Sequence, residues 1–544
     1  MIYKYFHTIR YLKFSQIYRR IVFNLLKPNI NKYIQLDLRN LQNKFFLPIS
    51  YQSTLLNKDT FKFLNEVKTL QRVGWDGSHT KTKKLWLYNL HYFDDLNAER
   101  ASERKDWHHK LMQSWVKENI IGKGTGWESY PTSIRIVNWI KWYLSGNIFP
   151  EKCLESLAIQ SRWLAKRIEW HILGNHLFKN AKALVFAGLF FSGEESDYWL
   201  KKGLKIIDKQ LSEQILDDGG NFERSPMYHA IFLEDLLDLV NIVQVYKNKK
   251  LIKKTKIWTN LINKMFNWLN VMKHPDGEIS FFNDSTFGIA PKLKQLSNYA
   301  KRLGIYNDLI KLNKVTHLNK SGYLRFSSKN IVTIIDVAPI GPNYLPGHAH
   351  ADTLSFELSL YGQRLLVNTG ISEYGLTSIR KYERSTKAHN TVEVNNENSS
   401  EVWHGFRVAR RAFPIDLKID ELKNYTKINC AHNGYQRLFG KPIHRRNWQF
   451  SKSSLIVNDQ IEGFYKNAYA YFHIHPSVNI LRKKNDIWSL VMSNGQKIIL
   501  EIKTGKSQIK QTYYSPEFGK RLKTQCIKVS IDKKVDRSCI KISW

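Results

Sequence analysis

The feature that most constrains this chain is a change in its hydrophobic periodicity near residue 320. Between about 100 and 310, apolar residues recur at the three- and four-residue spacing of helices. Beyond 320, short alternating runs are separated by Gly, Asn and Asp, which is typical of strands joined by turns. With 544 residues the chain is too long for one ordinary core. The pattern therefore predicts a multidomain α+β protein, helical first and β second.

The helical part is expected to form helical hairpins arranged as an incomplete α/α toroid, or alternatively a solenoid. Segments such as 134–144 are apolar on nearly all sides, so they should pack against neighbours on two faces. No strict repeat period is visible. The expected helices cover residues 101–119, 131–145, 151–173, 176–191, 195–213, 227–246, 251–272 and 290–303.

The second part predicts an antiparallel β-sandwich. The boundary at about 305–322 divides the chain into a toroid domain at 86–315 and a sandwich domain at 316–544. Residues 1–85 are left as a basic, helical extension that we expect to pack on the toroid. The expected strands lie at 322–326, 331–335, 353–360, 364–367, 455–457, 469–474 and 497–502.

The net charge of +37, from 84 Lys and Arg against 47 Asp and Glu, predicts attraction to polyanions. Nucleic acid, an acidic membrane surface and an acidic polysaccharide all fit, while a biased codon supply also explains a chain rich in Lys, Asn and Ile. Nucleic acid is the weakest candidate, because no recognised binding motif accompanies the charge. The four cysteines are too far apart for a zinc ribbon or a disulfide framework.

Membrane and export signals are not visible in the sequence. The longest apolar run, at 183–191, is about half of the roughly 20 residues that a transmembrane helix needs. Basic residues are spread through 1–23 instead of preceding an apolar stretch, as they would in a signal peptide. That segment is expected to be a helix packed on the protein, with an amphipathic surface helix as the alternative. Nothing in the sequence indicates the oligomeric state.

Two histidines and a carboxylate occur together in Gly347-His348-Ala349-His350-Ala351-Asp352, directly before the expected strand at 353–360. If the alternation of that strand extends back, His348, His350 and Asp352 share its buried face. Buried imidazoles and carboxylates are costly unless they have partners or a chemical task. This stretch is therefore a candidate site.

Two further motifs lie where helices begin. Asn175, in Gly174-Asn175-His176, is either a helix-end residue or an amide that binds a ligand carboxylate. Within 217–229, Ser225 is a plausible N-cap with Pro226 at the first helical position, which puts Tyr228 in the first turn. The helix dipole and nearby Arg224 should lower the pKa of Tyr228 from about 10, as a general base requires. The alternative is that Tyr228 only packs.

The basic segment 380–391 either clamps an anionic ligand or is a solvated loop. His389, near the end of this segment, is a candidate zinc ligand together with His350 and Asn368, because neutral imidazoles are good zinc ligands. Asn368 offers no anionic oxygen, so spacing alone favours the absence of a metal.

Together these motifs resemble the heparinase II/III family of polysaccharide lyases, most closely its heparinase III-like branch. The matching segments follow the family's order over about residues 85–480, so the joint match is specific although each piece is weak. They are 127–131, 174–176, 222–229, 347–352 with the strand that follows, 366–370 and 388–391.

The resemblance implies an α/α toroid joined to an antiparallel β-sandwich, and cleavage of uronic-acid-containing glycans by β-elimination. By the same resemblance, Asn175 neutralises the uronate carboxylate, Tyr228 acts as base or acid, and His348 is its partner in proton transfer. No cofactor is required, but His350 and His389 become ligands of a structural zinc whose usual Asp is replaced here by Asn368. Predicted substrate contacts are Trp127, Glu128, Glu223, Arg224, Arg384 and His389.

Family members are typically exported to the periplasm, whereas the absence of a visible leader in this sequence favours the cytoplasm equally. Two other functions remain open. A glycoside hydrolase would need paired carboxylates, for which Glu128, Asp217, Asp218 and Glu223 are available. A protein that binds or assembles acidic glycans without cleaving them is the non-enzymatic alternative.

Overall fold

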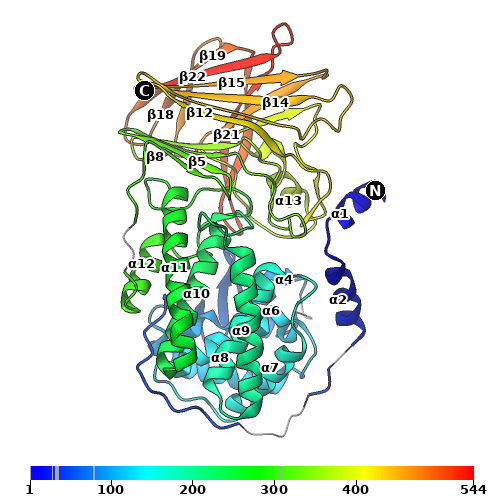
Figure 1. Ribbon diagram of the computed structural model, residues 1–544, viewed down its shortest axis with the longest axis vertical. Helices are drawn as coiled ribbons and strands as arrows, with labels where there is room; N and C mark the ends of the chain where they lie inside the picture. Colours follow the sequence, from blue (N-terminus) through cyan, green and yellow to red (C-terminus); the bar gives the residue numbers. More distant parts are fainter. Residues whose placement is uncertain (1, 27, 31–35, 78–79, 307–308) are drawn as a thin grey trace.

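The computed structural model describes residues 2–26, 28–30, 36–77, 80–306 and 309–544. Figure 1 shows a helical domain and a β domain placed end to end along the long axis, with the N-terminal helices along one side. The last helix of the helical domain ends at Arg302, and the first strand of the β domain begins at Val315. The predicted fold class, helices followed by antiparallel sheets, is confirmed.

The helical domain is built from paired helices. Their buried faces agree with the apolar spacing of the sequence. Helices α6, α8 and α10 are buried on nearly all sides, because neighbouring helices cover them on more than one face. The helices are α4 (Lys84–Tyr92), α5 (Lys105–Glu118), α6 (Ser129–Leu144), α7 (Cys153–Lys166), α8 (Gly174–Phe190), α9 (Glu194–Gln214), α10 (Pro226–Tyr246), α11 (Lys249–Met272) and α12 (Leu293–Arg302).

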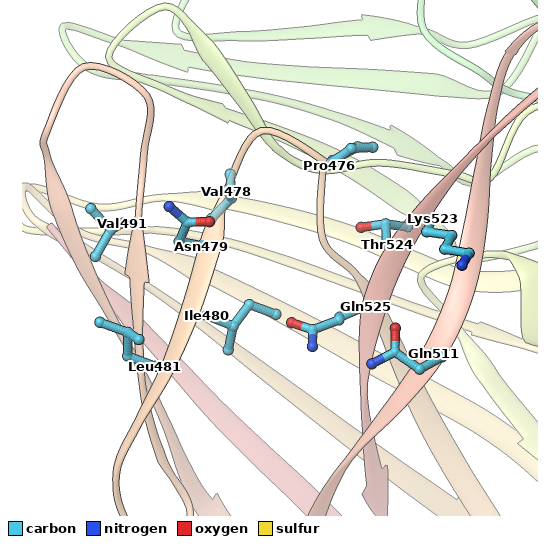
Figure 2. Close-up of a pocket in the computed structure, with 10 residues that line it drawn as sticks. All are labelled: Pro476, Val478, Asn479, Ile480, Leu481, Val491, Gln511, Lys523, Thr524 and Gln525. Atoms are coloured by element: carbon cyan, nitrogen blue, oxygen red, sulfur yellow. The ribbon is translucent and has the colours of Figure 1, made fainter.

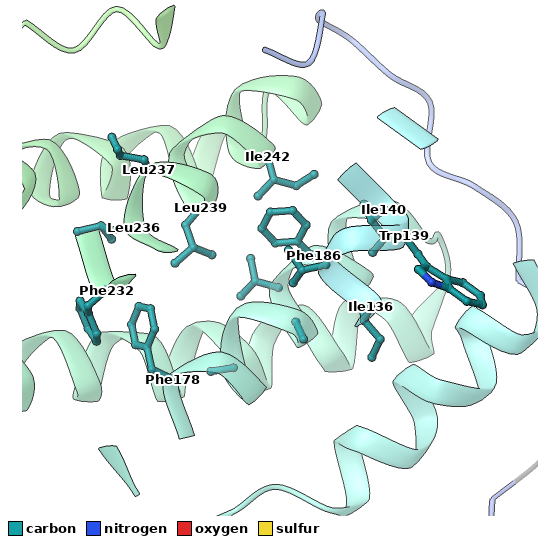
Figure 3. Close-up of a cluster of buried hydrophobic side chains, with 14 of the residues drawn as sticks. Ile136, Trp139, Ile140, Phe178, Phe186, Phe232, Leu236, Leu237, Leu239 and Ile242 are labelled. Atoms are coloured by element: carbon teal, nitrogen blue, oxygen red, sulfur yellow. The ribbon is translucent and has the colours of Figure 1, made fainter. Parts of the chain in front are cut away.

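The core of this domain lies where α6, α8 and α10 meet. Trp139 and Ile136 of α6, Phe178 of α8 and Phe232 of α10 are all buried there (Figure 3). The rings of Phe178 and Phe232 have centroids 4.1 Å apart, which joins α8 to α10 below the ends that carry the candidate site residues. Burial of several aromatic side chains makes these helices a rigid support for their first turns.

The β domain contains three larger antiparallel sheets, all of which contribute side chains to one hydrophobic core. The first sheet has β4 (Val315–Leu318), β5 (Tyr323–Ser328), β6 (Ile331–Asp336), β7 (Phe356–Leu360) and β8 (Gln363–Leu366), in that order. The second has β20 (Ser507–Glu517), β21 (Lys520–Ser530), β16 (Ala468–His473) and β9 (Val392–Val394). The third has β12 (Pro414–Glu421), β13 (Thr426–His432), β14 (Ile443–Phe450), β15 (Ser454–Glu462), β22 (Arg537–Ser543), β19 (Lys497–Thr504), β18 (Ile487–Val491) and β17 (Asn479–Lys484). Short strands β10 (Val402–Trp403) and β11 (Arg407–Val408) form a separate pair.

The expected continuation of the 353–360 strand back to His348 is wrong. Strand β7 begins only at Phe356, and the preceding residues form turns. Leu354 has a φ of +63°, and the backbone N–H of Ser355 donates to the carbonyl of Asp352 at 2.8 Å, so the chain reverses before the strand. The alternation at 347–352 therefore does not place its side chains on one strand face.

The N-terminal extension is helical only in part. Helices α1 (Ile2–Ile9) and α2 (Phe14–Leu25) agree with the expected helicity. The expectation that the extension packs on the toroid is wrong for α1, which contacts Trp403 of the β domain. They are followed by a small antiparallel sheet of β1 (Leu55–Asn57), β2 (Thr60–Phe63) and β3 (Glu66–Thr69), and by the short α3 (Leu70–Val73). Phe61 and Phe63 are buried in the helical domain's core, which explains why this segment forms strands against it. Within the described ranges, no helix is long and apolar enough to cross a membrane.

The two domains interlock through the loop between α11 and α12. The backbone N–H of Asp284 in this loop donates to the carbonyl of His348 at 2.9 Å, and that of Phe287 donates to the carbonyl of Pro516 at 2.7 Å. From the helical side, Arg224 donates to the carbonyl of Pro339 at 2.9 Å. These contacts bring the first turns of α8 and α10 against the loop that carries His348.

Candidate active site

Tyr228 lies in the first turn of α10, as the sequence predicted. The Ser225 hydroxyl accepts a hydrogen bond from the backbone N–H of Tyr228 at 3.1 Å, and Pro226 occupies the first helical position. The Tyr228 ring stacks on the imidazole of His348 with centroids 3.9 Å apart and planes inclined by 30°. One residue from each domain thus forms the centre of the site.

The expectation that Tyr228 is inclined toward the phenolate is wrong. Burial raises the pKa of Tyr228 well above its usual value, and the neighbouring hydroxyl of Tyr374 adds to the effect. The two hydroxyl oxygens are 3.0 Å apart. Arg224 cannot help to ionise the phenol, because its guanidinium turns to the carbonyl of Pro339. Desolvation therefore outweighs the helix dipole, and the resting side chain is a neutral phenol.

Asp284 orients the imidazole of His348. Its Oδ2 atom lies 2.8 Å from Nδ1 of His348, and the guanidinium of Arg380 contacts both carboxylate oxygens. Although Asp284 is fully buried, Arg380 and the two neighbouring histidines hold the pKa of its carboxyl well below the usual range. An ionised Asp284 only accepts hydrogen bonds, so Nδ1 of neutral His348 carries the proton and Nε2 keeps a free lone pair.

Asn175 and Glu223 form the second part of the site. The backbone N–H of Asn175, at the start of α8, donates to the Glu223 carboxyl, and Nε2 of His348 lies 3.5 Å from Oε2 of Glu223. Burial raises the pKa of Glu223. Neither Oδ1 of Asn175 nor Oε2 of Glu223 has a hydrogen-bond partner among the described residues. Unpaired buried polar atoms are costly, and their presence beside a Tyr–His pair is typical of a site that binds a polar ligand.

Several predicted substrate contacts lie elsewhere. Trp127 is buried among other tryptophans and donates to the carbonyl of Asn119, so it belongs to the core. Arg384 is buried, and its guanidinium donates hydrogen bonds to the carbonyls of Ala349 and Gly405. These side chains were expected to face a ligand, but their hydrogen bonds serve the packing of loops and helices.

Glu128 and Arg224 bind partners other than Tyr228 and His348. Glu128 accepts a hydrogen bond from the hydroxyl of Tyr88 and lies 3.0 Å from the ammonium of Lys84, with part of its side chain exposed. Arg224 has a φ of +59° and is largely buried in the domain junction. Its contact with Pro339 makes it a link between the domains, and the predicted substrate contact is not supported by its orientation.

His350 and His389 lie together, and neither faces solvent. Nδ1 of His350 is 3.1 Å from Nε2 of His389, while Nδ1 of His389 faces the carbonyl of Ser385 and Nε2 of His350 faces Asp284, both at 2.8 Å. The outer nitrogens must both donate, because a carbonyl and a carboxylate only accept. The lone pairs of His350 Nδ1 and His389 Nε2 consequently face each other, and the two histidines need a proton or a cation between these nitrogens. His389 cannot contact substrate as predicted, because it is buried.

A second histidine pair in the β domain shows the contrast. His432 accepts a hydrogen bond from the backbone N–H of Gly434 and lies 3.2 Å from Nδ1 of His444, which pairs through Nε2 with Asp459. Here the donor and acceptor roles alternate along the chain of contacts, so neutral imidazoles satisfy every bond. The facing lone pairs therefore distinguish the His350–His389 pair from the His432–His444 pair.

The metal prediction fits this geometry in part. A separation of 3.1 Å is close to the roughly 3.3 Å expected between two nitrogens bound to one tetrahedral zinc, and carboxylate and carbonyl partners are usual behind zinc-binding histidines. Asn368, however, accepts hydrogen bonds from Ser355 and Asn390 through its Oδ1 atom. Among the described residues no group of three or more His, Cys, Asp or Glu side chains is placed to hold a metal ion.

Asp284, Arg380 and Tyr374 are site residues that the sequence reasoning missed. Arg380 lies within the segment expected to clamp a ligand or to be solvated; it does neither, because it is buried on Asp284. Tyr374 follows β8 in a loop, and the guanidinium of Arg380 lies 4.9 Å from its ring. Of these three residues, only Arg380 lies in a segment that its basic composition marked as a candidate. Asp284 and Tyr374 lie in loops whose sequence shows no periodicity.

A separate hollow of about 520 Å³ opens in the β domain between β17 and the β20–β21 hairpin (Figure 2). No candidate residue lines it, and Lys523 is its one lining side chain with an ionisable group. It therefore lacks the groups for acid–base chemistry, and the junction between the domains remains the candidate site.

A helical domain followed by antiparallel sheets is also the fold of solved heparinase III structures. One such structure, a heparinase III, matches 97% of this chain and 88% of its own with a TM-score of 0.69 and 17% identity. The heparan sulfate lyase HepC from Pedobacter heparinus, crystallised as a mutant, matches 97% of this chain and 87% of its own at a TM-score of 0.62 and 17% identity.

The chain belongs to the heparinase II/III family. Residues 31–312 match the heparinase II/III N-terminal model, and residues 311–544 match the heparinase II/III-like C-terminal model. A heparin-sulfate lyase from Bacteroides stercoris is 24% identical over 335 residues, which is 58% of this chain. The aligned part spans 47% of that relative and 56% of the corresponding enzyme from Bacteroides thetaiotaomicron, about half of their length.

Proposed function

We propose that this chain is a polysaccharide lyase that cleaves uronic-acid-containing acidic glycans by β-elimination. The observation that carries the proposal is the Tyr228–His348 pair, in which Asp284 fixes the proton of the imidazole on Nδ1. A neutral phenol and an unprotonated imidazole nitrogen then lie side by side. This is the combination of acid and base that an elimination requires.

Neutralisation of the uronate carboxylate is the first requirement, because it acidifies the proton on C5. We assign this task to Asn175, with Glu223 beside it. Burial raises the pKa of Glu223, and in its neutral form Glu223 can donate a hydrogen bond to the carboxylate. An ionised Glu223 would repel the same group, so the burial of this side chain suits an anionic substrate.

Proton transfer then proceeds between two different groups. Nε2 of His348 takes the C5 proton, the electron pair forms the C4–C5 double bond, and the C4–O4 bond breaks. The raised pKa of Tyr228 suits it to give its proton to the departing O4 atom. The imidazolium and phenolate that result are neutralised by proton exchange with solvent, and no water is consumed.

The charge and the family both support the proposed substrate class. With 84 basic and 47 acidic residues, the chain attracts polyanions, which suits a heparan-sulfate-like glycan or a bacterial surface polysaccharide. Exposed parts of the site side chains, such as the 16% of the His348 side chain that solvent reaches, provide the contact area for the sugar ring.

A divalent ion at the His350–His389 pair would be structural. Zinc would be held by the facing nitrogens of His350 and His389 and would tie the 347–352 loop to residues 385–391. Asn368 does not offer a free oxygen to it, because its Oδ1 atom already accepts hydrogen bonds from Ser355 and Asn390. The chemistry assigned above uses Asn175, Tyr228 and His348 alone. We therefore propose that elimination requires no metal.

The test is to incubate purified protein with a panel of uronic-acid polymers and to follow the far-ultraviolet absorbance of the new C4–C5 double bond. Activity on at least one heparan sulfate, other glycosaminoglycan or bacterial capsular polymer is expected, and Tyr228→Phe should abolish turnover while binding survives. Silence across the panel would contradict the proposal. Chain cleavage without unsaturated products would instead indicate a glycoside hydrolase, and binding without cleavage a glycan-binding protein.

A further inference from the structure

The two N-terminal helices expose their apolar stripes to solvent. On α2, the apolar side chains at positions i, i+4, i+7 and i+11 share one helix face. They include Phe14, 82% exposed, and Leu25, 75% exposed. On α1 the corresponding positions begin with Ile2, 87% exposed. The full stripes are Ile2, Phe6 and Ile9 on α1, and Phe14, Tyr18, Ile21 and Leu25 on α2.

The opposite faces of these helices hold them on the protein. Gln16, a polar residue, is buried on the inner face of α2 and reaches the carbonyl of Tyr344 at 3.3 Å. The guanidinium of Arg167 lies 3.4 Å from the ring centroid of Phe23 and donates to the Phe23 carbonyl at 2.6 Å.

Helix α1 is held by Trp403 of β10. The indole of Trp403 donates to the hydroxyl of Thr8 at 3.1 Å, and its ring packs on Tyr5. Figure 1 shows α1 level with the β domain and α2 level with the helical domain, on the same side of the molecule. A helix docked on its own domain normally turns the apolar stripe inward. Here both stripes turn outward, so they suit a partner outside the chain.

The charge of this segment is entirely positive. No Asp or Glu occurs before Asp37, whereas Arg19 and Arg20 flank the stripe of α2 and Arg10 directly follows α1. Five of the basic side chains before Leu25 are exposed: Lys4, Arg10, Lys13, Arg19 and Arg20. A helix with an apolar stripe and basic flanks is the pattern that binds the surface of an anionic bilayer, with the apolar side chains in the acyl boundary and the cations at the headgroups.

We propose that α1 and α2 attach this protein peripherally to an anionic lipid bilayer. The helices lie on the surface and do not cross it, since none of those described is long and apolar enough to span. A second copy of this chain fits the surface poorly, because each would bring the same basic flanks to the contact. A soluble acidic glycan would pair with the cations and leave the apolar stripes in water.

The proposal is tested with the full chain by flotation with vesicles of phosphatidylcholine, with and without phosphatidylglycerol. The protein should float with the anionic vesicles. Because the whole chain carries +37, any variant will feel some attraction, so the decisive comparison keeps the charge constant. Phe14→Ser/Leu25→Ser should weaken partitioning about tenfold or more, because it removes two inserted apolar side chains.

The matched control is Phe439→Ser/Phe464→Ser, which removes two exposed rings of the β domain, one of them 85% exposed. It should leave partitioning within about twofold of the parent. A second pair tests the charges: Arg19→Gln/Arg20→Gln should weaken binding to anionic vesicles more than Lys533→Gln/Lys534→Gln, which removes two exposed cations elsewhere.

The proposal fails if the parent protein does not float with anionic vesicles, or if both serine pairs weaken flotation equally. It also fails if light scattering shows a dimer that Phe14→Ser/Leu25→Ser dissociates, since the stripes would then bind a second copy. None of these outcomes bears on the lyase activity, which is measured separately on soluble polymer.

Discussion

One carboxylate oxygen of Asp284 lies 2.8 Å from Nδ1 of His348, and this contact determines which imidazole nitrogen is free to act. Asp284 comes from the loop between α11 and α12, whereas His348 comes from the β domain. Arg380 keeps Asp284 ionised in a buried position, so the proton stays on Nδ1 of His348. The chemistry proposed at Nε2 therefore depends on a residue that does not contact the substrate.

Asp284→Asn should lower kcat between about 100-fold and 10,000-fold, because the amide can donate to His348 and favour the wrong tautomer. The measurement is the initial rate of double-bond formation on the best polymer of the panel. Asp459→Asn is the matched control, since Asp459 binds His444 and Arg446 in the same manner at a distance from the site. Equal losses in the two variants would reduce Asp284 to a structural residue.

Tyr374→Phe should reduce kcat about 5- to 10-fold, with little change in KM, because it removes one hydrogen bond of roughly 1 kcal/mol to the Tyr228 hydroxyl. Its effect should appear chiefly on the alkaline limb of the pH–rate profile, where the Tyr228 proton is lost. Tyr382→Phe removes a similar hydroxyl contact, to Thr512, and provides the control. An unaltered rate and pH profile in Tyr374→Phe would remove Tyr374 from the mechanism.

Glu223→Gln should retain most of the activity and extend it to higher pH. Burial raises the pKa of Glu223, so its neutral form persists above the usual carboxyl range and is lost as the pH rises. Loss of that proton places a negative charge beside the uronate and should raise KM, an effect that glutamine cannot show. The check is KM as a function of pH for the parent, Glu223→Gln and Glu223→Ala. A glutamine variant as impaired as the alanine variant would indicate that the ionised carboxylate is the active form.

Zinc added to chelator-treated protein should raise the thermal unfolding temperature and change turnover by less than about twofold, because the proposed ion only joins two loops. His389→Ala should abolish the rise. His432→Ala is the control, since the His432–His444 pair already satisfies its hydrogen bonds with neutral rings. An unfolding temperature that zinc leaves unchanged would show that the His350–His389 pair is bridged by a proton instead.

Local sequence patterns predicted much of the helical domain and the start of α10. The expected helices at 131–145 and 227–246 are α6 and α10 with ends within two residues, because apolar spacing and an N-cap followed by proline act within one element. The expected continuation of the 353–360 strand back to His348 is wrong for a related reason. Alternation over six residues is also compatible with a turn when tertiary contacts, such as the Leu354 N–H to Asp336 carbonyl bond, hold it.

The sequence by itself determined which side chains are available at the site and which elements carry Asn175 and Tyr228. Tertiary structure alone decided that Asp284, 64 residues before His348, orients it, and that burial keeps Tyr228 a neutral phenol. It also decided that the apolar stripes of α1 and α2 face outward. Periodicity is a property of one element, whereas the partner of a loop residue and its solvation depend on how separate elements pack.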